Sequence, residues 1–329
     1  AVDARRGVVA LLAAFGAVGV GEAALGIWQH RLAGEGPLHF LITPGVYRAY
    51  GTFMQPNPFG GFLGLLAAIF VGLALGEGWQ AVTAKRLPAR WFWPAAGTAL
   101  IMVGGLYGSW SRGAWMGFGA ALALMAVWLP RRSGWGIALL VVIVLAGGLL
   151  AAAEALPAAV VARLTDFLAY VRFEDVRGVG VNDANYAVME RMAHWQAALG
   201  MWESHFWTGV GLGNYEAAYP HFRLVNWPYA LGHAHNFYLN LLAETGVIGL
   251  GAYLVFAAAI YARLWQATRR LIGWPRGLAV GLAGAWTQLH VHNLVDNLYV
   301  NNVHLHLGVL LALTAWLALL ASESMAKTA

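Results

Sequence analysis

Long apolar runs constrain this chain more than any other feature of its sequence. A helix needs about 20 apolar residues to cross the hydrocarbon core of a bilayer, which is roughly 30 Å thick. Runs close to that length lie at residues 7–29, 58–76, 91–108, 114–129, 135–153, 237–262, 277–299 and 304–321. The sequence therefore predicts an all-α fold: a polytopic transmembrane helical bundle of about eight spans, forming a single transmembrane domain over residues 1–329.

The residue composition agrees with a membrane interior and limits the available chemistry. Hydrophobic residues make up 60% of the chain and charged residues 11%, against roughly 25% charged residues in an ordinary soluble domain. Because cysteine is absent, neither disulfides nor thiolates can contribute. Any catalysis must therefore use arginine, histidine, carboxylates or hydroxyls.

The positive charges predict the orientation of the chain and the kind of partner it has. Lys and Arg number 20 against 15 Asp and Glu, but these charges fall in short clusters between the apolar runs and form no basic surface for nucleic acid. The positive-inside rule places such clusters in the cytoplasm, and strict alternation of the runs puts all of them on one side. The clusters are Arg5/Arg6, Lys85/Arg86/Arg90, Arg131/Arg132, Arg263/Arg269/Arg270/Arg276 and Lys327. We therefore expect membrane lipids as partners, no nucleic acid, and both ends of the chain in the cytoplasm.

The segment 154–232 is predicted to be a large, partly helical loop outside the cytoplasm. Connections of this length are generally functional or carry their own structure. Two amphipathic helical stripes indicate structure here. One stripe consists of Val188, Met192, Trp195, Leu199, Trp202 and Phe206, and the other of Val160, Val161, Leu164, Phe167, Leu168 and Val171. We expect the loop to cap the helices, with the second stripe lying in the membrane interface.

Three motifs resemble the O-antigen ligase family. His235 and Asn236 are followed, after nine intervening residues, by Gly246 and then by Gly249, a spacing similar to the family's histidine signature. The segment 48–57, which leads into a span, resembles the family's segment before a central helix, and the turn 111–113 resembles its short outward turn. With the large loop, the resemblance covers most of the chain from Arg48 to Gly251.

The resemblance implies a membrane glycosyltransferase of the bacterial inner membrane whose active site faces the periplasm. Members of the family move a glycan from undecaprenyl pyrophosphate to an acceptor hydroxyl, here with lipid A core as the leading acceptor. O-antigen polymerisation and protein O-oligosaccharyl transfer remain alternatives. The family's usual helix count exceeds eight, and the chain begins with Ala1, so we expect further helices upstream.

For the glycosyl pyrophosphate that the resemblance implies, the side chains that the reaction needs can be stated independently. The leaving group needs its negative charge bound, and arginine binds phosphate oxygens through a planar fork while staying charged. The outward-facing candidates for substrate binding are Arg48, Arg112 and Arg191; looser alternatives are Arg163, Arg172, Arg177 and Arg223. Each could instead pair with lipid head groups.

The histidine signature supplies the predicted catalytic residue. His235 is expected to position or deprotonate the acceptor hydroxyl, the alternative being a capping or packing residue at a helix start. His233 and Asn236 are expected to bind substrate beside it. Glu244 joins them because an ionisable group inside a span is a functional candidate, although it could instead neutralise a buried arginine. Gly246, Gly249 and Gly251 are assigned only to helix packing.

No metal or cofactor is expected, although a metal or small-solute transporter is the alternative from another class. Histidine is the commonest metal ligand, and three His-x-His pairs lie near the outward face: His233/His235, His290/His292 and His304/His306. However, residues two apart in a helix point to nearly opposite sides, so the pairs within helices cannot each chelate one ion. A polar path for a solute or for sugar hydroxyls is formed by Asp296 with Asn293, Asn297, Asn301 and Asn302.

The glycines from Gly209 to Gly213 do not form a phosphate loop, because they lack the following Lys-Ser/Thr of that motif.

Overall fold

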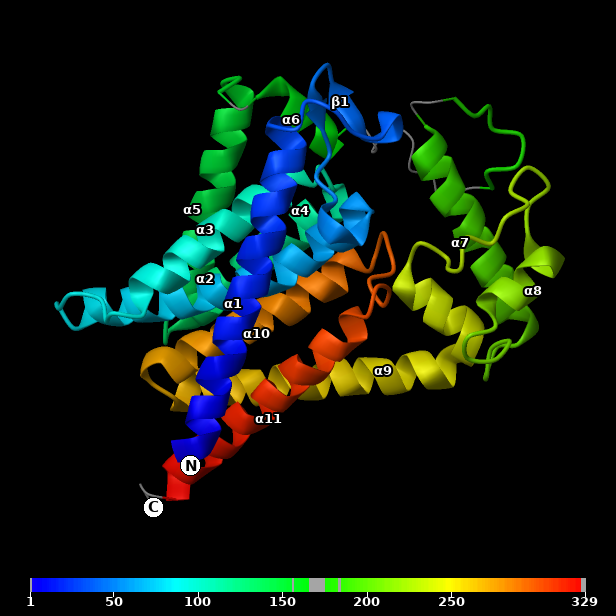
Figure 1. The fold of residues 1–329 in the computed structure, drawn as a ribbon. Coiled ribbons are helices and arrows are strands. Elements are labelled where there is room, and N and C mark those ends of the chain that lie inside the picture. The colour runs from blue at the N-terminus through cyan, green and yellow to red at the C-terminus, as the bar shows by residue number, and fades with distance from the viewer. Residues whose placement is uncertain (1, 156, 166–174, 183–184, 327–329) are drawn as a thin grey trace. The chain divides into compact units, whose positions relative to one another are not determined.

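The computed structural model describes residues 2–155, 157–165, 175–182 and 185–326, and its long elements are helices (Figure 1). This confirms the all-α fold. The chain divides into two compact units. The first contains Ala1–Val142, Ala259–His292 and Tyr299–Ala329, and the second contains Ile143–Ala258 and Asn293–Leu298. The prediction of one transmembrane domain over 1–329 stays a prediction.

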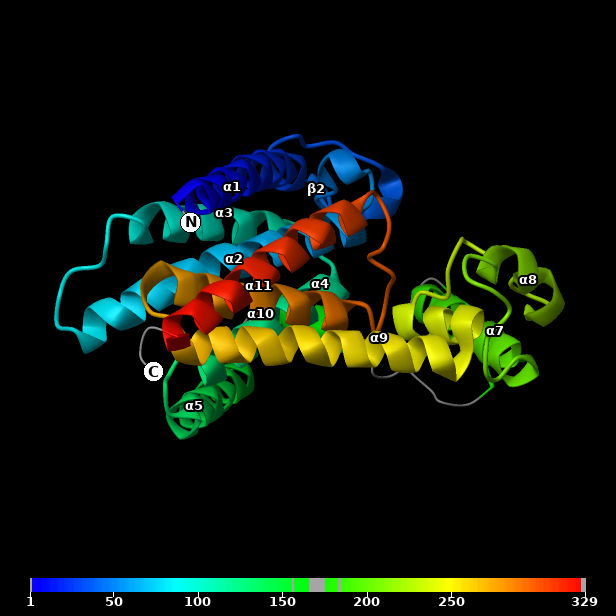
Figure 2. The same ribbon diagram turned by 90° about the horizontal axis from the view of Figure 1, so that it is seen from below.

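The first unit is a bundle built around α2 and α10. Its helices are α1 (Val2–Arg31), α2 (Pro56–Thr83), α3 (Phe92–Gly108), α4 (Arg112–Trp128), α10 (Gly273–His292) and α11 (Val303–Ala326). Helix α10 packs against α2, α4 and α11, and α2 and α1 each pack against α3 (Figure 2). Most of the α2 surface is buried, which explains why its sequence is apolar on all sides.

Glycines bring α2 and α10 into close contact. A Cβ built on Gly76 would lie 2.5 Å from the Cα of Gly277, and one built on Gly72 would meet the backbone of Gly281. The two helices therefore meet through matched small residues four apart, an arrangement that lets backbones approach within a membrane. Any side chain at these positions would push the helices apart.

The helices that lie wholly in the second unit come from the large loop. They are α6 (Ala158–Thr165), α7 (Tyr186–Ser204) and α8 (Tyr215–Phe222), while α5 (Ser133–Ala152) and α9 (Phe237–Arg270) belong to both units. Helix α9 is kinked at Gly246, whose φ of 62° and ψ of −166° are accessible essentially only to glycine. At the kink, α9 is bonded to the turn that follows α7, because the Val247 N–H donates to Phe206 O at 3.1 Å. Gly246 thus has a conformational role besides helix packing.

Helices occupy all eight predicted ranges, but the number of spans is not confirmed. Among the described residues, five helices are long and apolar enough to cross a membrane: α1, α2, α5, α9 and α11. Helices α3 and α4 have 17 residues each. Helix α10 ends at His292, before the predicted end at residue 299, and the polar segment 293–302 that follows leaves the helix.

The segment between α1 and α2 folds back onto α1. It contains the short antiparallel strands β1 (Leu41–Thr43) and β2 (Val46–Tyr47), with Leu41 opposite Tyr47 and Thr43 opposite Val46. The Gln29 Oε1 atom accepts hydrogen bonds from the backbone N–H groups of Tyr50 at 3.1 Å and Gly51 at 2.7 Å. The sequence did not predict these strands, which are too short to show an alternating pattern.

The large loop is partly helical, as predicted, but its buried face is different. Helix α7 buries small residues and methionines: Met189, Met192, Ala193, His194, Ala197, Ala198 and Met201. Of the predicted stripe, only Met192 is buried. Trp195 and Trp202 are half-buried at the edge of the buried face, and Phe206 is exposed beyond the helix end. Small residues occupy the buried face of α7 because they allow closer packing than indole rings. In the second stripe, Val160 and Val161 lie on α6, whereas Phe167, Leu168 and Val171 lie outside the described residues.

Candidate functional site

Two polar centres contain the predicted site residues, one in each unit. In the first unit, the arginine turn consists of Arg48, Ser109, Ser111 and Arg112. The Arg48 Nε atom donates to Ser109 O at 3.0 Å, and its Nη2 atom donates to Asn57 Oδ1 at 3.0 Å. The Ala49 N–H bonds Gly108 O at 2.7 Å. The structure therefore brings Arg48 to the turn that carries Arg112.

The arginine turn ends at the N-terminus of α4. Ser111 is the N-cap, since its hydroxyl accepts the Ala114 N–H at 3.4 Å, and Arg112 is the first helical residue. Helix N-termini attract anions through free backbone N–H groups and the helix dipole. A guanidinium at this point adds a full positive charge, so the turn is suited to a phosphate group. Trp110 and Trp115, with ring centroids 5.1 Å apart, flank the turn and were not predicted.

The histidine cluster of the second unit consists of His194, His233, His235 and Asp296. One possible ligand atom from each of His233, His235 and Asp296 lies within 4.8 Å of the other two. The His235 ring meets the His233 ring at 4.5 Å and the His194 ring at 5.4 Å, both edge to face. These groups come from α7, from the loop before α9 and from the segment 293–298.

Asn236 fixes the loop to the start of α9. Its Oδ1 atom accepts the backbone N–H groups of Tyr238 at 3.0 Å and Leu239 at 3.1 Å, which is the geometry of an N-cap. Its Nδ2 atom donates to Leu294 O at 2.9 Å. His235 just before the cap has φ of 52°, a left-handed conformation. In the structure Asn236 is thus a positioning residue for the neighbouring histidine.

A backbone hydrogen bond sets the tautomer of His233. The His235 N–H donates to His233 Nδ1 at 3.0 Å. Since Nδ1 must then carry a lone pair, the neutral ring has its proton on Nε2 and presents a donor there. A metal at Nδ1 would displace this bond, and a metal at Nε2 would require the other tautomer. The arrangement therefore suits hydrogen bonding better than metal ligation.

Both ring nitrogens of His235 are buried and have no hydrogen-bond partner among the described residues. Burial lowers the pKa of His235 to about 3, with smaller contributions in the same direction from His233 and Arg191. Burial also lowers the pKa of His233. Both rings are therefore neutral at pH 7, and the His235 ring can offer a lone pair to a ligand hydroxyl.

His194 is the functional candidate that sequence reasoning missed. It is fully buried at 0% exposure, its Nδ1 lies 3.0 Å from the Tyr215 hydroxyl, and its ring stacks on Tyr219 at 4.8 Å. Burial lowers its pKa to about 4. The signal available was the alternative stripe Met189, Ala193, Ala197 and Met201, next to which His194 lies on α7.

Arg191 belongs to the same region as the histidine cluster. Its Nε atom donates to Val295 O at 3.1 Å and its Nη1 atom to Ala187 O at 2.6 Å. Glu244 is placed differently. It is 8% exposed, and its Oε1 atom accepts the Tyr215 N–H at 3.0 Å, so it caps the N-terminus of α8.

Of the looser arginine candidates, Arg177 is bound elsewhere. Arg177 forms an exposed ion pair with Asp175, with 2.5 Å between Nε and Oδ2. Arg223 is exposed and Arg163 is half-buried. Arg172 lies outside the described residues.

In each of the other two His-x-His pairs, one ring lies against an aromatic side chain. His290 Nδ1 lies 3.1 Å from the Tyr261 hydroxyl, and the His306 ring packs against Phe62 at 5.1 Å. Of the residues of the expected polar path, Asp296, Asn293 and Asn297 belong to the second unit, and Asn301 and Asn302 belong to the first. In the part of the chain that the structure describes, only His233, His235 and Asp296 have spacing near that of metal ligands.

Comparison with known proteins identifies one match. Residues 97–254 match the family model described as O-Antigen ligase. No curated protein sequence matches the chain. The matched region contains Arg112 from the arginine turn and Arg191, His194, His233 and His235 from the second unit, whereas Arg48 and Asp296 lie outside it.

Proposed function

Because residues 97–254 match the family model described as O-Antigen ligase and five helices among the described residues are long and apolar enough to cross a membrane, we propose that this protein transfers a glycan from undecaprenyl pyrophosphate to an acceptor hydroxyl of lipid A core. The observation that carries the proposal is His235. Its ring is neutral, both its nitrogens lack a partner within the described chain, and it lies in one cluster with His233 beside Arg191. A polar group buried in this way has a ligand as its natural partner.

The proposed reaction forms one bond and breaks one. The acceptor oxygen attacks the anomeric carbon of the donor glycan, and the bond from that carbon to the pyrophosphate oxygen breaks. The hydroxyl proton passes to the lone pair of His235, and the pyrophosphate leaves with the bonding electrons. His235 later releases the proton to solvent or to the departing phosphate.

The low pKa of His235 defines how it would act. Because burial lowers the pKa of His235, the ring is a weak base for the proton of a sugar hydroxyl until the anomeric bond weakens. The proton therefore moves late, and His235 first orients the hydroxyl. The negative pyrophosphate would also raise the pKa of the ring, because an opposite charge favours the imidazolium.

Arginines are proposed as the ligands of the donor pyrophosphate. Arg191 is tied to the segment 293–298 by its bond to Val295, which holds its guanidinium beside the histidine cluster. Arg112 extends from a helix N-terminus, and the Ser109 and Asn57 bonds hold Arg48 at the same turn. Fixed donors of this kind stabilise charge as it develops on a leaving group.

Transfer is proposed to need no metal. The tautomer of His233 supports this, since its Nδ1 is already an acceptor for the His235 N–H. Its Nε2–H is then available to Asp296 or to a substrate oxygen.

The proposed location is the bacterial inner membrane, with the histidine cluster facing the periplasm. The chain has no native cysteine, so single cysteines report topology directly. A cysteine at position 180 should react with an impermeant maleimide added to spheroplasts, and one at position 86 should react only after permeabilisation. Reaction of position 180 from the cytoplasmic side alone would overturn the proposed orientation.

A reconstituted transfer assay tests the function itself. Purified protein would be given a synthetic undecaprenyl-pyrophosphate glycan, a chelator and one of three acceptors: lipid A core, a second glycan or a hydroxyl-containing peptide. Mass spectrometry should find the glycan on lipid A core, with loss of this product in the His235→Ala variant. Transfer to the glycan or to the peptide would select the polymerase or protein-glycosylation alternative. Solute uptake into proteoliposomes without any transfer would instead indicate a transporter.

A further inference from the structure

The first unit contains a cavity that the proposed transfer reaction does not use. Its volume is about 450 Å³, and residues of α1, α2, α3 and α10 line it. All of them belong to the first unit. The lining residues are Arg5, Val9, Leu12, Ala13, Gly16, Ala17, Val20, Phe70, Leu73, Glu77, Trp91, Pro94, Ala95, Thr98 and Trp274.

The lining of the cavity changes from charged to apolar along α1. Arg5 lies at one end of the lining and Val20 at the other, a separation of about 22 Å for fifteen helical residues at 1.5 Å each. From Val9 to Val20 the α1 lining is apolar, and Phe70 and Leu73 face it from α2. Charged and indole groups occur only toward the Arg5 end. One leaflet of hydrocarbon is about 15 Å deep, so the apolar length matches one acyl chain.

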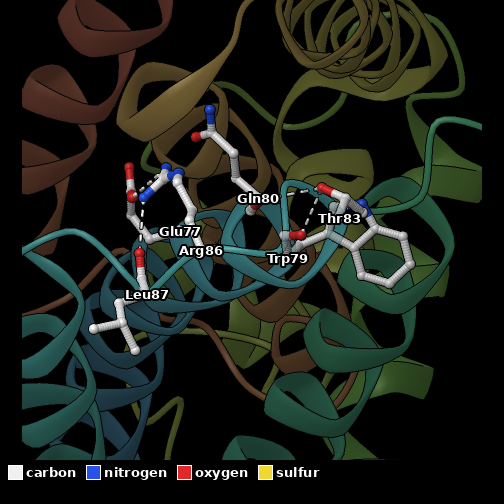
Figure 3. A network of polar contacts seen from close by, with 6 residues as sticks. All are labelled: Glu77, Trp79, Gln80, Thr83, Arg86 and Leu87. Atoms are coloured by element: carbon white, nitrogen blue, oxygen red, sulfur yellow. Dashed lines mark hydrogen bonds and ion pairs between the residues drawn. The ribbon is translucent and has the colours of Figure 1, made fainter.

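The mouth of the cavity carries net positive charge. The Arg5 guanidinium lies 5.4 Å from the centre of the Trp274 ring, and Arg90 lies 5.1 Å from the ring of Trp91, another lining residue. The one acid, Glu77, pairs with Arg86 at 3.8 Å (Figure 3). Arg86 is held there by a second bond, from its Nη1 atom to Leu87 O at 3.0 Å. The acid is thus already neutralised, which leaves Arg5 for an external anion.

We propose that this cavity binds one anionic phospholipid, with an acyl chain along α1 and the phosphate at Arg5. Indole rings such as those of Trp91 and Trp274 favour the depth of the head groups. The positive groups at the mouth favour an anionic lipid over a zwitterionic one, whose ammonium would find no free carboxylate among the described residues that line the cavity. The lipid occupies the end of the bundle that carries Arg5, Arg86 and Arg90, the end expected to face the cytoplasm.

Native mass spectrometry of the detergent-purified chain, titrated with phosphatidylglycerol or phosphatidylcholine, tests the proposal through two matched pairs of variants. For the head group the pair is Arg5→Gln and Arg6→Gln, because Arg6 does not line the cavity. Arg5→Gln should weaken phosphatidylglycerol binding about tenfold, the loss of one charged hydrogen bond, and Arg6→Gln should leave it unchanged.

The acyl chain is tested by Gly16→Leu against Gly21→Leu. A Cβ at Gly16 would approach the Phe70 ring at 3.2 Å inside the cavity, whereas one at Gly21 meets nothing within 4 Å. Gly16→Leu should abolish the retained lipid, and Gly21→Leu should keep it. If Gly16→Leu unfolds, Ala13→Leu blocks the same cavity from an exposed position. Equal binding by Arg5→Gln and Arg6→Gln, equal affinity for both lipids, or retention by both cavity variants would overturn the proposal.

Discussion

The arginine turn and the histidine cluster differ in the charge that their side chains carry. In the turn, Arg48 is bonded to Ser109 and Asn57, and Arg112 lies half-buried at a helix start. In the cluster, His235 and His194 are buried deeply enough that burial lowers the pKa of each ring well below its usual range. One centre keeps full positive charge, and the other keeps neutral rings.

This difference corresponds to the two tasks of a glycosyl transfer. Binding a pyrophosphate requires charge that does not titrate, which guanidinium supplies. Orienting a hydroxyl requires a lone pair, which only a neutral imidazole supplies. Burial would hinder pyrophosphate binding because it disfavours a charged group. It helps to orient a hydroxyl because it keeps the imidazole neutral. The predictions below test whether the two centres divide the work in this way.

Loss of the His235 ring should have the largest effect. His235→Ala should reduce transfer by about 10²- to 10⁴-fold, the usual contribution of a general base, while donor binding survives. The measurement is single-turnover transfer together with the donor dissociation constant. His235→Gln, which restores a hydrogen-bonding group, should recover part of the rate if the ring mainly orients the hydroxyl. A parallel loss of donor affinity would show instead that His235 binds phosphate.

The arginines should affect donor affinity more than turnover. Arg112→Ala and Arg191→Ala should each weaken donor binding roughly 10- to 100-fold, because a hydrogen bond to a charged group contributes about 1.5–3 kcal/mol. Lysine should not rescue either, since a point charge lacks the planar fork. Arg132→Ala, at an exposed arginine of a cluster expected to face the cytoplasm, is the control.

The double variant asks whether Arg112 and Arg191 act on one pyrophosphate. If they do, the effects of the two substitutions should be non-additive in donor affinity. Strict additivity would indicate that they bind separate groups. Full activity in both single variants would remove arginine from the proposed donor site.

The buried histidines should make the fold sensitive to acid. Their folded pKa values, about 4 for His194 and about 3 for His235, lie below the unfolded value of 6.5. Below pH 6.5 the unfolded chain therefore binds more protons, so stability is complete above this pH and falls as the pH falls toward 4. The loss should be on the order of 1–3 kcal/mol.

Thermal unfolding from pH 7.5 to 4.5 measures this effect. His194→Phe should flatten the pH dependence, whereas His205→Phe, at an exposed position of the same unit, should leave it unchanged. An equal slope in wild type and His194→Phe would mean that His194 does not resist protonation.

The smallest effect is expected at the α9 cap. Asn236→Ala should cost about 1 kcal/mol of stability through loss of the N-cap, and Asn236→Ser should recover most of it. Because Asn236 positions His235, transfer should follow stability in both variants. Loss of transfer in a normally stable Asn236→Ser protein would restore the substrate-binding role predicted from the sequence.

The sequence alone determined the features that depend on short stretches of chain. Apolar length and period predicted the helices, and the spacing of His235, Asn236 and Gly246 predicted the resemblance to the O-antigen ligase family model that residues 97–254 match. Its expected outward position in the large loop made Arg191 a candidate, but the sequence could not give its hydrogen-bond partners. These signals need only neighbours within a few helical turns, because a helix is defined by local hydrogen bonds and by which face is apolar.

Tertiary structure decided everything that joins distant segments. Arg191 bonds Val295, 104 positions away, and Glu244 caps a helix that begins 29 positions earlier, at Tyr215. His194 became part of the cluster because α7 buries its small residues and not its tryptophans. The tautomer of His233 and the low pKa of His235 follow from that burial and from one backbone bond. No spacing along the chain encodes such contacts, because desolvation and hydrogen-bond partners exist only once the helices have packed.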